Sequence, residues 1–345
     1  MRFAHLVAGV DRLHGIMRTV YNQYDSMVRP LCKWLVGHGV RFELNTRVTD
    51  LGLSGQGVDK TVTRIACERG GQASEIVVGA SDYVLVTLGS MTEASSLGNM
   101  DEAPRLKGKE VGGAWTLWER IACGRPEFGH PSVFADHIDE SKWVSFTTTL
   151  YSPAFFRLVL DFTRNVPGEG GVVTFPESNW LASIVIPHQP HFMNQPDDVA
   201  VFWGYGLCAD KPGNFVKKPM SACTGREIMT EVVGHLSSDA DSAGILETAV
   251  CIPCLMPFIT SQFLRRGIGD RPQVVPKGWK NLAFIGQFCE LPDDVVFTVE
   301  YSIRSAQTAV YELLRLRREP PAVYKGEFDP RVIYSAFMAP CDLTP

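Results

Sequence analysis

A short apolar run near the end of the chain is followed by groups that could hold a charged ligand. Leu282–Ile285 is apolar and stops at Gly286, which predicts a buried parallel strand ending at a glycine. From Val299 to Leu314 apolar residues recur at helical spacing, with Thr298 as the candidate N-cap. A strand that ends at glycine, with a helix N-terminus close by, lets backbone N–H groups approach a ligand oxygen or phosphate. An ordinary strand–helix crossover fits the same pattern equally well.

Three arginines lie just before this run, in the segment Leu255–Pro276. Arg265, Arg266 and Arg271 could hold a pyrophosphate or a carboxylate through paired hydrogen bonds. A solvated basic turn explains the same residues as well.

Cys251 and Cys254 form the single CxxC motif of the chain. The sequence around them has neither a second cysteine pair nor an HxxxH motif, so we expect buried structural thiols rather than a metal or redox site. The nine cysteines are scattered and odd in number, which suits reduced thiols in the cytoplasm better than a disulfide framework.

The composition is that of an ordinary globular protein. With 345 residues, 45% hydrophobic and 21% charged, the chain is long enough for two domains or one large composite domain. A formal charge of -5 gives no reason to expect nucleic acid as a partner. The sequence shows neither an apolar run of about 20 residues nor the layout of a signal peptide.

Local patterns predict the elements that would position these groups. In the N-terminal part we expect a helical segment at 1–13, a helix from Met27 to Gly37, a strand from Val40 to Val48 that then turns away, a hairpin at 59–67 and 73–79, and a buried strand Asp82–Thr87 running into Gly89. In the middle we expect strands at 143–150, 182–186 and 201–207, with a flexible turn at Gly168–Gly171. After Glu319 the proline-rich tail should wrap loosely or fray.

Aromatic residues are concentrated in the middle of the chain. Their packing in a core is the simpler interpretation, and an apolar pocket for a long aliphatic ligand is the alternative. The set comprises Trp115, Trp118, Trp143, Trp180, Trp203, Phe155, Phe156, Phe162 and Phe192.

Several sequence stretches, in order, resemble the oleate hydratase family, also called myosin-cross-reactive antigens. They are YNQYDS at 21–26, HGV-F at 38–42, VTD at 48–50, T-x-GS-TE at 87–93, MP-IT with GDRP between 256 and 272, FIGQF at 284–288 and FTVEYS at 297–302. The resemblance implies an α/β fold of the FAD-binding, two-dinucleotide-binding-domain flavoprotein type, here incomplete, with an inserted mixed α+β substrate domain.

The same resemblance divides the chain into five parts. These are a substrate-side helix with the YNQY motif at 1–30, the second half of an FAD-binding domain at 31–100, a substrate domain at 101–275, a final FAD-domain strand and helix at 276–318, and a proline-rich tail at 319–345.

For function, the resemblance implies hydration of a cis double bond in an unsaturated fatty acid, giving a hydroxy fatty acid, with FAD in a structural role. The family's water-activating glutamate and proton-donating tyrosine align before Met1, as does the glycine-rich FAD fingerprint. Met1 also begins abruptly inside an amphipathic segment. We therefore expect a cut or truncated chain that lacks both catalytic groups and is inactive as written.

The resemblance also assigns binding roles. Gln23 matches a glutamine that contacts the fatty-acid carboxylate, with Tyr21, Asn22 and Tyr24 as its support, and His191 matches a histidine of the same anchor. Val185 and Pro187 stand where the family has a threonine and an asparagine, which puts the anchor or the substrate preference in doubt. The positions expected near FAD are Gly89, Ser90, Gly286, Gln287, Thr298 and Ser302.

Two other functions stay open. One is an FAD-dependent oxidoreductase of the amine-oxidase or desaturase type, which shares the cofactor fold but would reduce the flavin during turnover. The other is a non-catalytic lipid-binding remnant, which would expose apolar surface where further chain should dock. Peripheral membrane contact and a homodimer are likewise open.

Overall fold

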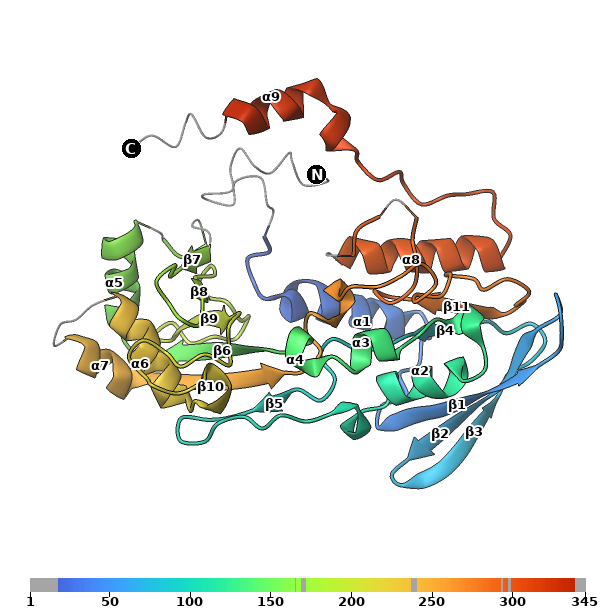
Figure 1. Cartoon of the computed structure of the whole chain (residues 1–345), viewed down its shortest axis with the longest axis horizontal. Helices are drawn as coiled ribbons and strands as arrows, with labels where there is room; N and C mark the ends of the chain where they lie inside the picture. Colours follow the sequence, from blue (N-terminus) through green and yellow to red (C-terminus); the bar gives the residue numbers. More distant parts are fainter. Residues whose placement is uncertain are drawn as a thin grey trace.

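A computed structural model describes residues 18–164, 166–168, 172–236, 241–292, 294–296 and 299–338, with the side chains of residues 241–243 left out. It contains a three-stranded, a six-stranded and a two-stranded sheet. The buried apolar residues form two cores, one around the two-stranded sheet and one around the six-stranded sheet. Figure 1 shows these two parts side by side along the longest axis of the molecule.

The three-stranded sheet is an antiparallel meander of β1 (Thr46–Ser54), β2 (Thr61–Arg69) and β3 (Gln72–Val77). Gly70 and Gly71 join β2 to β3 with φ angles of 57° and 80°, as a tight hairpin turn requires. The hairpin predicted for 59–67 and 73–79 is therefore confirmed.

The strand predicted at Val40–Val48 is wrong in its position. The chain is irregular from residue 40 to 43 and turns at 44–45, and β1 begins at Thr46 and continues past Val48 to Ser54. The alternating residues Val40, Phe42 and Leu44 are all exposed, since none of the described strands or helices covers them. A register shift between Val48 and Asp50 bends the strand where a turn was expected.

The two-stranded sheet is parallel and pairs β4 (Val84–Thr87) with β11 (Leu282–Ile285). Both predicted strands are confirmed, and Val84 lies opposite Leu282. Helix α8 (Val299–Leu313) packs against β11 and buries Tyr301, Ser305, Ala309 and Leu313. The predicted cap Thr298 lies outside the described residues.

Three helices complete the first core: α2 (Ala114–Ala122), α3 (Ser132–Ala135) and α4 (Ile138–Ser141). Trp115 and Trp118 of α2 are fully buried and pack against Phe288, with ring centroids 4.9 and 5.8 Å apart. These two tryptophans thus belong to the first core and not with the other aromatic residues of the middle segment.

The six-stranded sheet is antiparallel, in the order β5-β10-β6-β9-β8-β7. Its strands are β5 (Ser96–Leu97), β6 (Trp143–Leu150), β7 (Val172–Thr174), β8 (Ala182–Val185), β9 (Ala200–Gly206) and β10 (Ala249–Met256). The strand predicted at 143–150 matches β6, and those predicted at 182–186 and 201–207 agree with β8 and β9 within one residue at each end. The turn expected at Gly168–Gly171 lies mostly outside the described residues.

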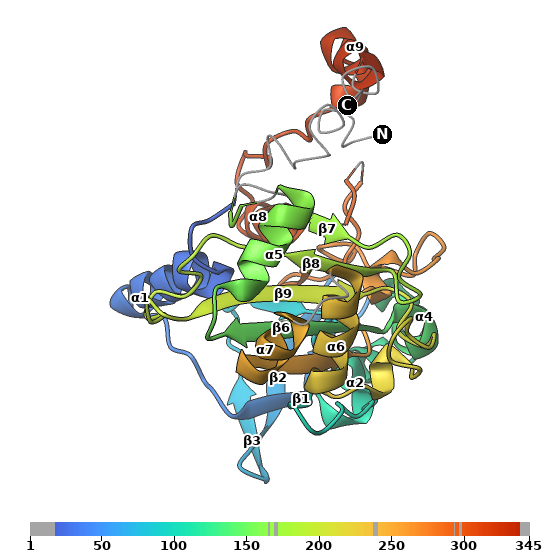
Figure 2. The same cartoon turned by 90° about the vertical axis from the view of Figure 1, so that its left-hand side faces the viewer.

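Helices α5 (Ala154–Thr163), α6 (Gly225–Leu236) and α7 (Asp241–Thr248) cover one face of this sheet, as Figure 2 shows. Their apolar side chains and the inward residues of the strands form the second core. Phe155 stacks on Phe202 with the ring centroids 4.2 Å apart.

The N-terminal helix begins as a π-helical turn, Tyr24–Val28, and continues as α1 (Arg29–Gly37), which confirms the predicted helix with an earlier start. The helical segment predicted at 1–13 lies outside the described residues. Short 3-10 helices occur at Lys109–Val111, Pro126–Phe128, Met220–Ala222, Ser261–Phe263 and Gly326–Phe328.

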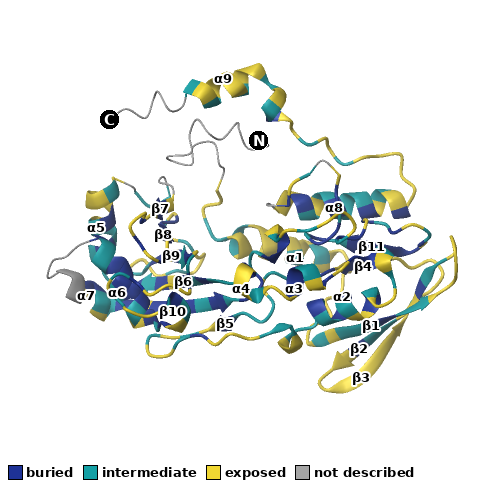
Figure 3. Ribbon diagram, in the orientation of Figure 1, coloured by how far each residue is buried: buried dark blue, intermediate teal, exposed yellow. Residues whose placement is uncertain are grey.

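The tail is more regular than its prolines indicated, because α9 (Pro330–Met338) is helical. Pro330 is its first residue, where a missing N–H costs little. Figure 3 shows α9 apart from both cores, and it contains no buried residue.

Candidate functional site

The carboxyl ends of the two parallel strands both run into a glycine with a left-handed conformation. Gly89 follows β4 with φ of 59°, and Gly286 follows β11 with φ of 97°. Both glycines are buried, and a Cβ on Gly286 would lie 3.1 Å from the Thr87 methyl group at the end of β4. The fold therefore brings these two predicted cofactor positions to the same edge, where ligands bind in parallel α/β sheets.

Gly89 also has a packing role. A Cβ at this position would lie 2.8 Å from the Trp115 ring and 3.0 Å from Phe288. The carbonyl of Ser90 accepts a hydrogen bond from Nε1 of Trp115 at 3.0 Å. Gly89 and Ser90 thus hold α2 against the strand end, which accounts for a glycine here without a ligand.

The remaining expected cofactor residues lie after β11. The side-chain oxygen Oε1 of Gln287 is buried and has no hydrogen-bond partner among the described residues. The Gly286 N–H donates to Oγ of Ser305 at 2.9 Å, and that hydroxyl donates to the carbonyl of Ser302. Ser305, which no local motif identified, therefore links Gly286 to the first turns of α8.

A cavity of about 750 Å³ opens along β1 and β4. Its walls are formed by Asn45–Val48 of the β1 region, by Val84–Thr87 of β4, and by Gly112–Ala114 where α2 begins. Its size falls in the range of small-molecule and cofactor pockets. The cavity includes backbone at a helix N-terminus and a strand edge, both of which can offer hydrogen bonds to a ligand.

Glu93 is the last residue of the T-x-GS-TE stretch, and no structural role was predicted for it. Its Oε2 accepts the N–H groups of Ala114 and Trp115 at 3.0 and 3.3 Å and so caps α2. Burial raises the pKa of this carboxyl above its usual range, although the two backbone hydrogen bonds and Arg47 oppose the shift. A cap supplied from 21 residues upstream leaves no local sequence signal.

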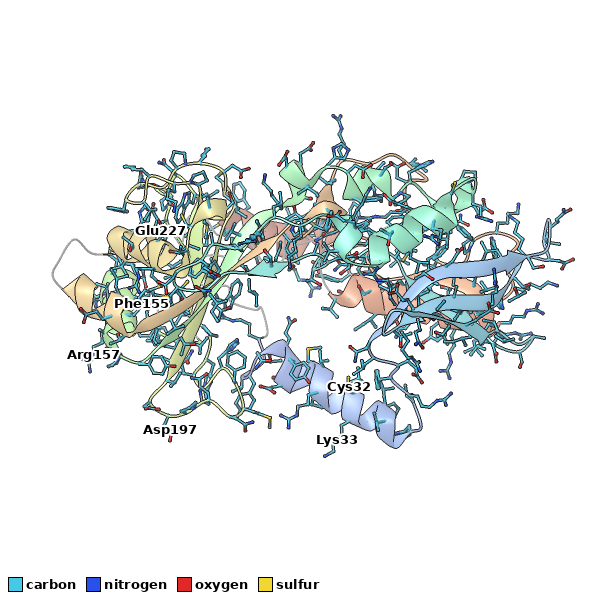
Figure 4. The ribbon with its side chains drawn as sticks, turned by 90° about the horizontal axis from the view of Figure 1, so that it is seen from below. Cys32, Lys33, Phe155, Arg157, Asp197 and Glu227 are labelled. Atoms are coloured by element: carbon cyan, nitrogen blue, oxygen red, sulfur yellow. The ribbon has the colours of Figure 1, made fainter. Side chains whose placement is uncertain are left out.

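The second group of predicted residues lies where the N-terminal segment meets the β8–β9 loop. The backbone N–H of Asn22 donates to the carbonyl of His191 at 2.9 Å, and its side-chain Nδ2 donates to the same oxygen at 3.1 Å. Asp25 extends this contact, because its Oδ2 accepts Nδ2 of Asn22 at 2.8 Å and the N–H of Met193 at 3.1 Å. The two motifs expected to form one anchor are therefore in direct contact, and Figure 4 shows α1, labelled at Cys32 and Lys33, beside the loop labelled at Asp197.

His191 is held in a form that suits ligand binding. Its Nδ1 is buried and has no hydrogen-bond partner among the described residues. Burial lowers the pKa of His191 below its usual range, and the nearby Asp25 carboxylate opposes that shift. Hydrogen bonds to Met193 and Asn22 hold the pKa of Asp25 low in turn. At neutral pH the imidazole is thus neutral, with one ring nitrogen left to bond an incoming group.

The other anchor residues differ in exposure. Gln23 is exposed, and Tyr21 is half-buried with its carbonyl accepting the hydroxyls of Thr19 and Ser26. Val185 and Pro187 are buried, so the two positions where the family carries polar groups are apolar here.

One face of the six-stranded sheet carries aromatic side chains, and α5, α6 and α7 all lie on the other face (Figure 2). The inward residues Val144, Phe146 and Phe202 pack under α5 and α6, so their neighbours along the strands point to the opposite face. Thr147 pairs with Trp203 and Ile252 across the strands, and Trp203 is 37% exposed. We call this surface the open sheet face; its residues are Trp143, Ser145, Thr147, Trp203, Tyr205, Val250 and Ile252.

Trp143 and Trp203 flank Tyr205 on the open sheet face, with ring centroids 5.0 and 6.1 Å from the tyrosine ring. Of the aromatic residues predicted to line either a core or a pocket, Trp180 and Phe155 lie fully in the second core. The core interpretation is therefore right for those two residues, and the open sheet face retains aromatic surface for a ligand.

The CxxC residues lie on strand β10, where burial raises the pKa of Cys251 to about 12. Burial also raises the pKa of Cys254, and the two side chains, three residues apart on a strand, point to opposite faces. Within the described ranges the structure has no cluster of His, Cys, Asp and Glu side chains that could hold a metal ion.

The structure is thus that of a mixed α/β protein with several sheets, in which glycines end both parallel strands and a histidine loop is tied to the N-terminal segment. A model of the MCRA family matches residues 1–311. The chain belongs to this family, and the resemblance to oleate hydratases is confirmed.

Two curated relatives are similar along most of this chain. It is 39% identical to an oleate hydratase of Streptococcus pyogenes serotype M49 (strain NZ131), over 98% of this chain and 59% of that protein. It is 32% identical to a linoleate hydratase of Lactiplantibacillus plantarum, over 88% of this chain and 57% of that protein. The chain therefore spans less than two thirds of the length of these relatives. None of its described helices has both the length and the apolar character needed to cross a bilayer.

Proposed function

We propose that this chain has the function of an oleate hydratase-like protein. Such a fatty-acid hydratase adds water to a cis double bond of an unsaturated fatty acid and yields a hydroxy fatty acid. The observation that carries the proposal is the direct bond between Asn22 of the YNQY motif and the carbonyl of His191. It joins two stretches that are 169 residues apart, both of which match the family's carboxylate anchor. The names of the two relatives support the same reaction class.

In this proposal Gln23 and His191 hold the fatty-acid carboxylate. The neutral imidazole donates one N–H to a carboxylate oxygen, and the exposed Gln23 amide donates a second hydrogen bond. Asn22 and Asp25 keep the His191 loop in place, since both bond its backbone or that of Met193. Anchoring one end of the ligand sets which carbon atoms are presented further along its chain.

The open sheet face supplies apolar surface for the hydrocarbon part. Trp203, Tyr205 and Ile252 are exposed or half-buried on that face. Gln189 ties the His191 loop to this sheet, because its Nε2 donates to the carbonyl of Val201 at 2.8 Å. Covering these side chains with an aliphatic chain removes apolar surface from water and favours binding.

FAD is the cofactor that we propose, with a structural role because hydration transfers no electrons. Gly89, Ser90, Gly286, Gln287, Thr298 and Ser302 would hold it, and the cavity along β1 and β4 would take part of it. The residues fit the group in two respects: the buried Oε1 of Gln287 lacks a partner within the described chain, and both strand ends turn at glycine. When bound, the flavin would shape and close the site around the substrate.

The division into a cofactor part and a substrate part fits the two separate cores, and the domain boundaries at 30, 100, 275 and 318 remain proposals. A cytoplasmic location, peripheral contact with a membrane and a homodimer likewise remain proposals for this chain.

Binding of oleate to the purified chain tests the anchor. We expect His191→Leu and Gln23→Leu each to raise the Kd for oleate about tenfold, the loss of one charge-assisted hydrogen bond. His188→Leu, which replaces an exposed histidine of the same loop, should leave the Kd unchanged. Methyl oleate should bind all four proteins alike. Equal oleate affinity in His191→Leu and the wild type would refute the anchor.

Turnover with added FAD separates hydration from redox chemistry. A hydratase yields a product heavier by one water with an unchanged flavin absorption spectrum. Bleaching of the flavin by the fatty acid would instead indicate the oxidoreductase of the amine-oxidase or desaturase type.

A further inference from the structure

Arg271 is a buried cation without a carboxylate partner among the described residues. The residue is 4% exposed, and its Nη2 donates to the carbonyl of Gln262 at 2.7 Å. Its guanidinium carbon lies 5.7 Å from the centre of the Phe134 ring. Nε has no hydrogen-bond partner in the described parts of the chain. A buried charge in such surroundings is costly unless an anion balances it.

The neighbouring arginines differ from it. Arg265 is exposed, and Arg266 forms an ion pair with Glu290 at 2.7 Å. Burial lowers the pKa of Arg271, with Tyr301 and Glu290 opposing the shift and Arg266 adding to it. Of the three arginines that the sequence marked for an anion, Arg271 is therefore the one that is buried and has no carboxylate partner among the described residues.

A cavity of about 500 Å³ adjoins Arg271. Its wall includes Gln262, Arg266 and Arg271, together with Asp294–Val296. The amide oxygen of Gln262, a residue only 6% exposed, is buried and without a partner among the described residues. Two buried polar side chains with unused hydrogen-bonding capacity thus lie at one cavity.

The carboxylates close to the cavity do not satisfy Arg271. Glu290 is engaged by Arg266, and Asp294 is engaged by Arg304 at 2.9 Å with its side chain fully buried. The loop that carries Arg271 is also fixed, because the N–H and Nδ1 of His130 bond the backbone carbonyl and side chain of Asp270 at 3.0 and 2.9 Å. The guanidinium therefore has a set position next to open space.

We propose that this cavity binds the oxyanion group of a ligand, a carboxylate or a phosphate, through Arg271, with Arg266 as the second cation and Gln262 as a neutral partner. The planar guanidinium offers paired donors that match either group. The amide of Gln262 can turn over to present its NH₂ group, since its oxygen and nitrogen exchange with no change of shape. This site is built from elements other than the His191 anchor and does not depend on it.

Two simple anions test the proposal on the full chain by isothermal titration at constant ionic strength. Sodium pyrophosphate represents the diphosphate of a dinucleotide, and sodium decanoate represents a fatty-acid carboxylate, with decanol as the uncharged control. We expect the wild type to bind one of the two anions and Arg271→Leu to weaken its binding about tenfold or more. Arg271→Lys keeps the positive charge and loses the paired donors of the guanidinium. Its affinity for the anion should lie between that of the wild type and that of Arg271→Leu.

The matched control is Arg265→Leu, which removes an exposed arginine of the same loop and should bind as the wild type does. Gln262→Leu gives a second test if Arg271→Leu does not fold, and it should weaken binding several-fold. If Arg271→Leu loses binding of pyrophosphate, the ligand of the cavity carries a phosphate group. If Arg271→Leu loses binding of decanoate, the ligand carries a carboxylate. The proposal is overturned if the wild type binds neither anion, or if Arg265→Leu and Arg271→Leu bind alike.

Discussion

The two-stranded parallel sheet and the six-stranded antiparallel sheet are assembled over very different lengths of chain. Strands β7, β8 and β9 are consecutive and pair in sequence order, so this part of the six-stranded sheet forms from neighbouring segments. In the parallel sheet Val84 pairs with Leu282, and nearly 200 residues lie between them. Parallel strands need such crossovers, because a tight turn cannot join them.

This difference matters for the proposed function. The glycines at the ends of β4 and β11 are separated in sequence by the whole six-stranded sheet. The loop that carries His191 joins β8 to β9 and so belongs to the more local part of the fold, whereas the open sheet face also includes β6 and β10. We infer that the proposed cofactor edge depends on a longer crossover than the loop that carries His191.

Removal of one buried aromatic ring from each core should give the largest loss of stability. It also tests whether the two cores unfold independently. Phe284 on β11 and Phe202 on β9 are both fully buried. Substitution of either by alanine should lower the free energy of unfolding by about 3–5 kcal/mol. Hydrogen exchange followed by mass spectrometry should show Phe284→Ala loosening β4 and β11, and Phe202→Ala loosening β6, β8 and β9. If each variant loosens both sheets to the same extent, the two cores form one cooperative unit and the comparison fails.

A smaller loss of stability is expected when Glu231, beside the second core, is replaced. This fully buried carboxylate accepts the N–H groups of Asn214, Phe215 and Val216 at 2.5, 2.9 and 2.8 Å. Glu231→Gln should lower the free energy of unfolding by about 2 kcal/mol, since hydrogen bonds to a charged acceptor are the stronger kind. Urea denaturation measures the change.

The exposed Glu247→Gln serves as its control and should leave the midpoint unchanged. Protection of β4 and β11 should be the same in both variants. If both variants lose the same free energy of unfolding, Glu231 has no specific role in stability.

The smallest expected effect is the contribution of His191 to the pH dependence of stability. Because burial depresses the pKa of its folded form, the unfolded chain takes up this proton first as the pH falls. The stability contributed by the neutral imidazole is therefore present above about pH 6.5 and is lost as the pH falls through the depressed pKa. His191→Gln should lose less stability than the wild type between about pH 7.5 and pH 5.5.

Urea midpoints across that interval measure the difference, with the exposed His188→Gln as the control. A variant whose stability falls as steeply as that of the wild type would show that His191 does not titrate as described. Bound oleate should reduce the slope of the wild type, because the carboxylate stabilises the protonated ring.

Patterns within a few residues were sufficient for many elements. Leu282–Ile285 and Trp143–Leu150 were predicted as strands from their runs and alternation, and Gly70-Gly71 marked the turn between β2 and β3. The motif strings predicted the family, which the comparisons confirm. These features are local because periodicity, turn conformation and motif letters are properties of consecutive residues.

Features that depend on a partner elsewhere were not predictable in this way. The alternation at Val40, Phe42 and Leu44 is typical of a strand, yet none of the described strands pairs with it and β1 begins at Thr46. The division of the tryptophans between two cores, the cap that Glu93 provides for α2 and the role of Ser305 also appeared only in the structure.

The sequence by itself determined which residues could carry the chemistry: the YNQY and histidine motifs, the two strand-end glycines and the three arginines. Only the tertiary structure decided which of them act together. It placed Asn22 against His191 across 169 residues, and it buried Arg271 without a carboxylate partner in the described part of the chain while Glu290 pairs with Arg266. The physical reason is that burial and pairing depend on how distant segments pack together, and the spacing of residues along the chain does not record that packing.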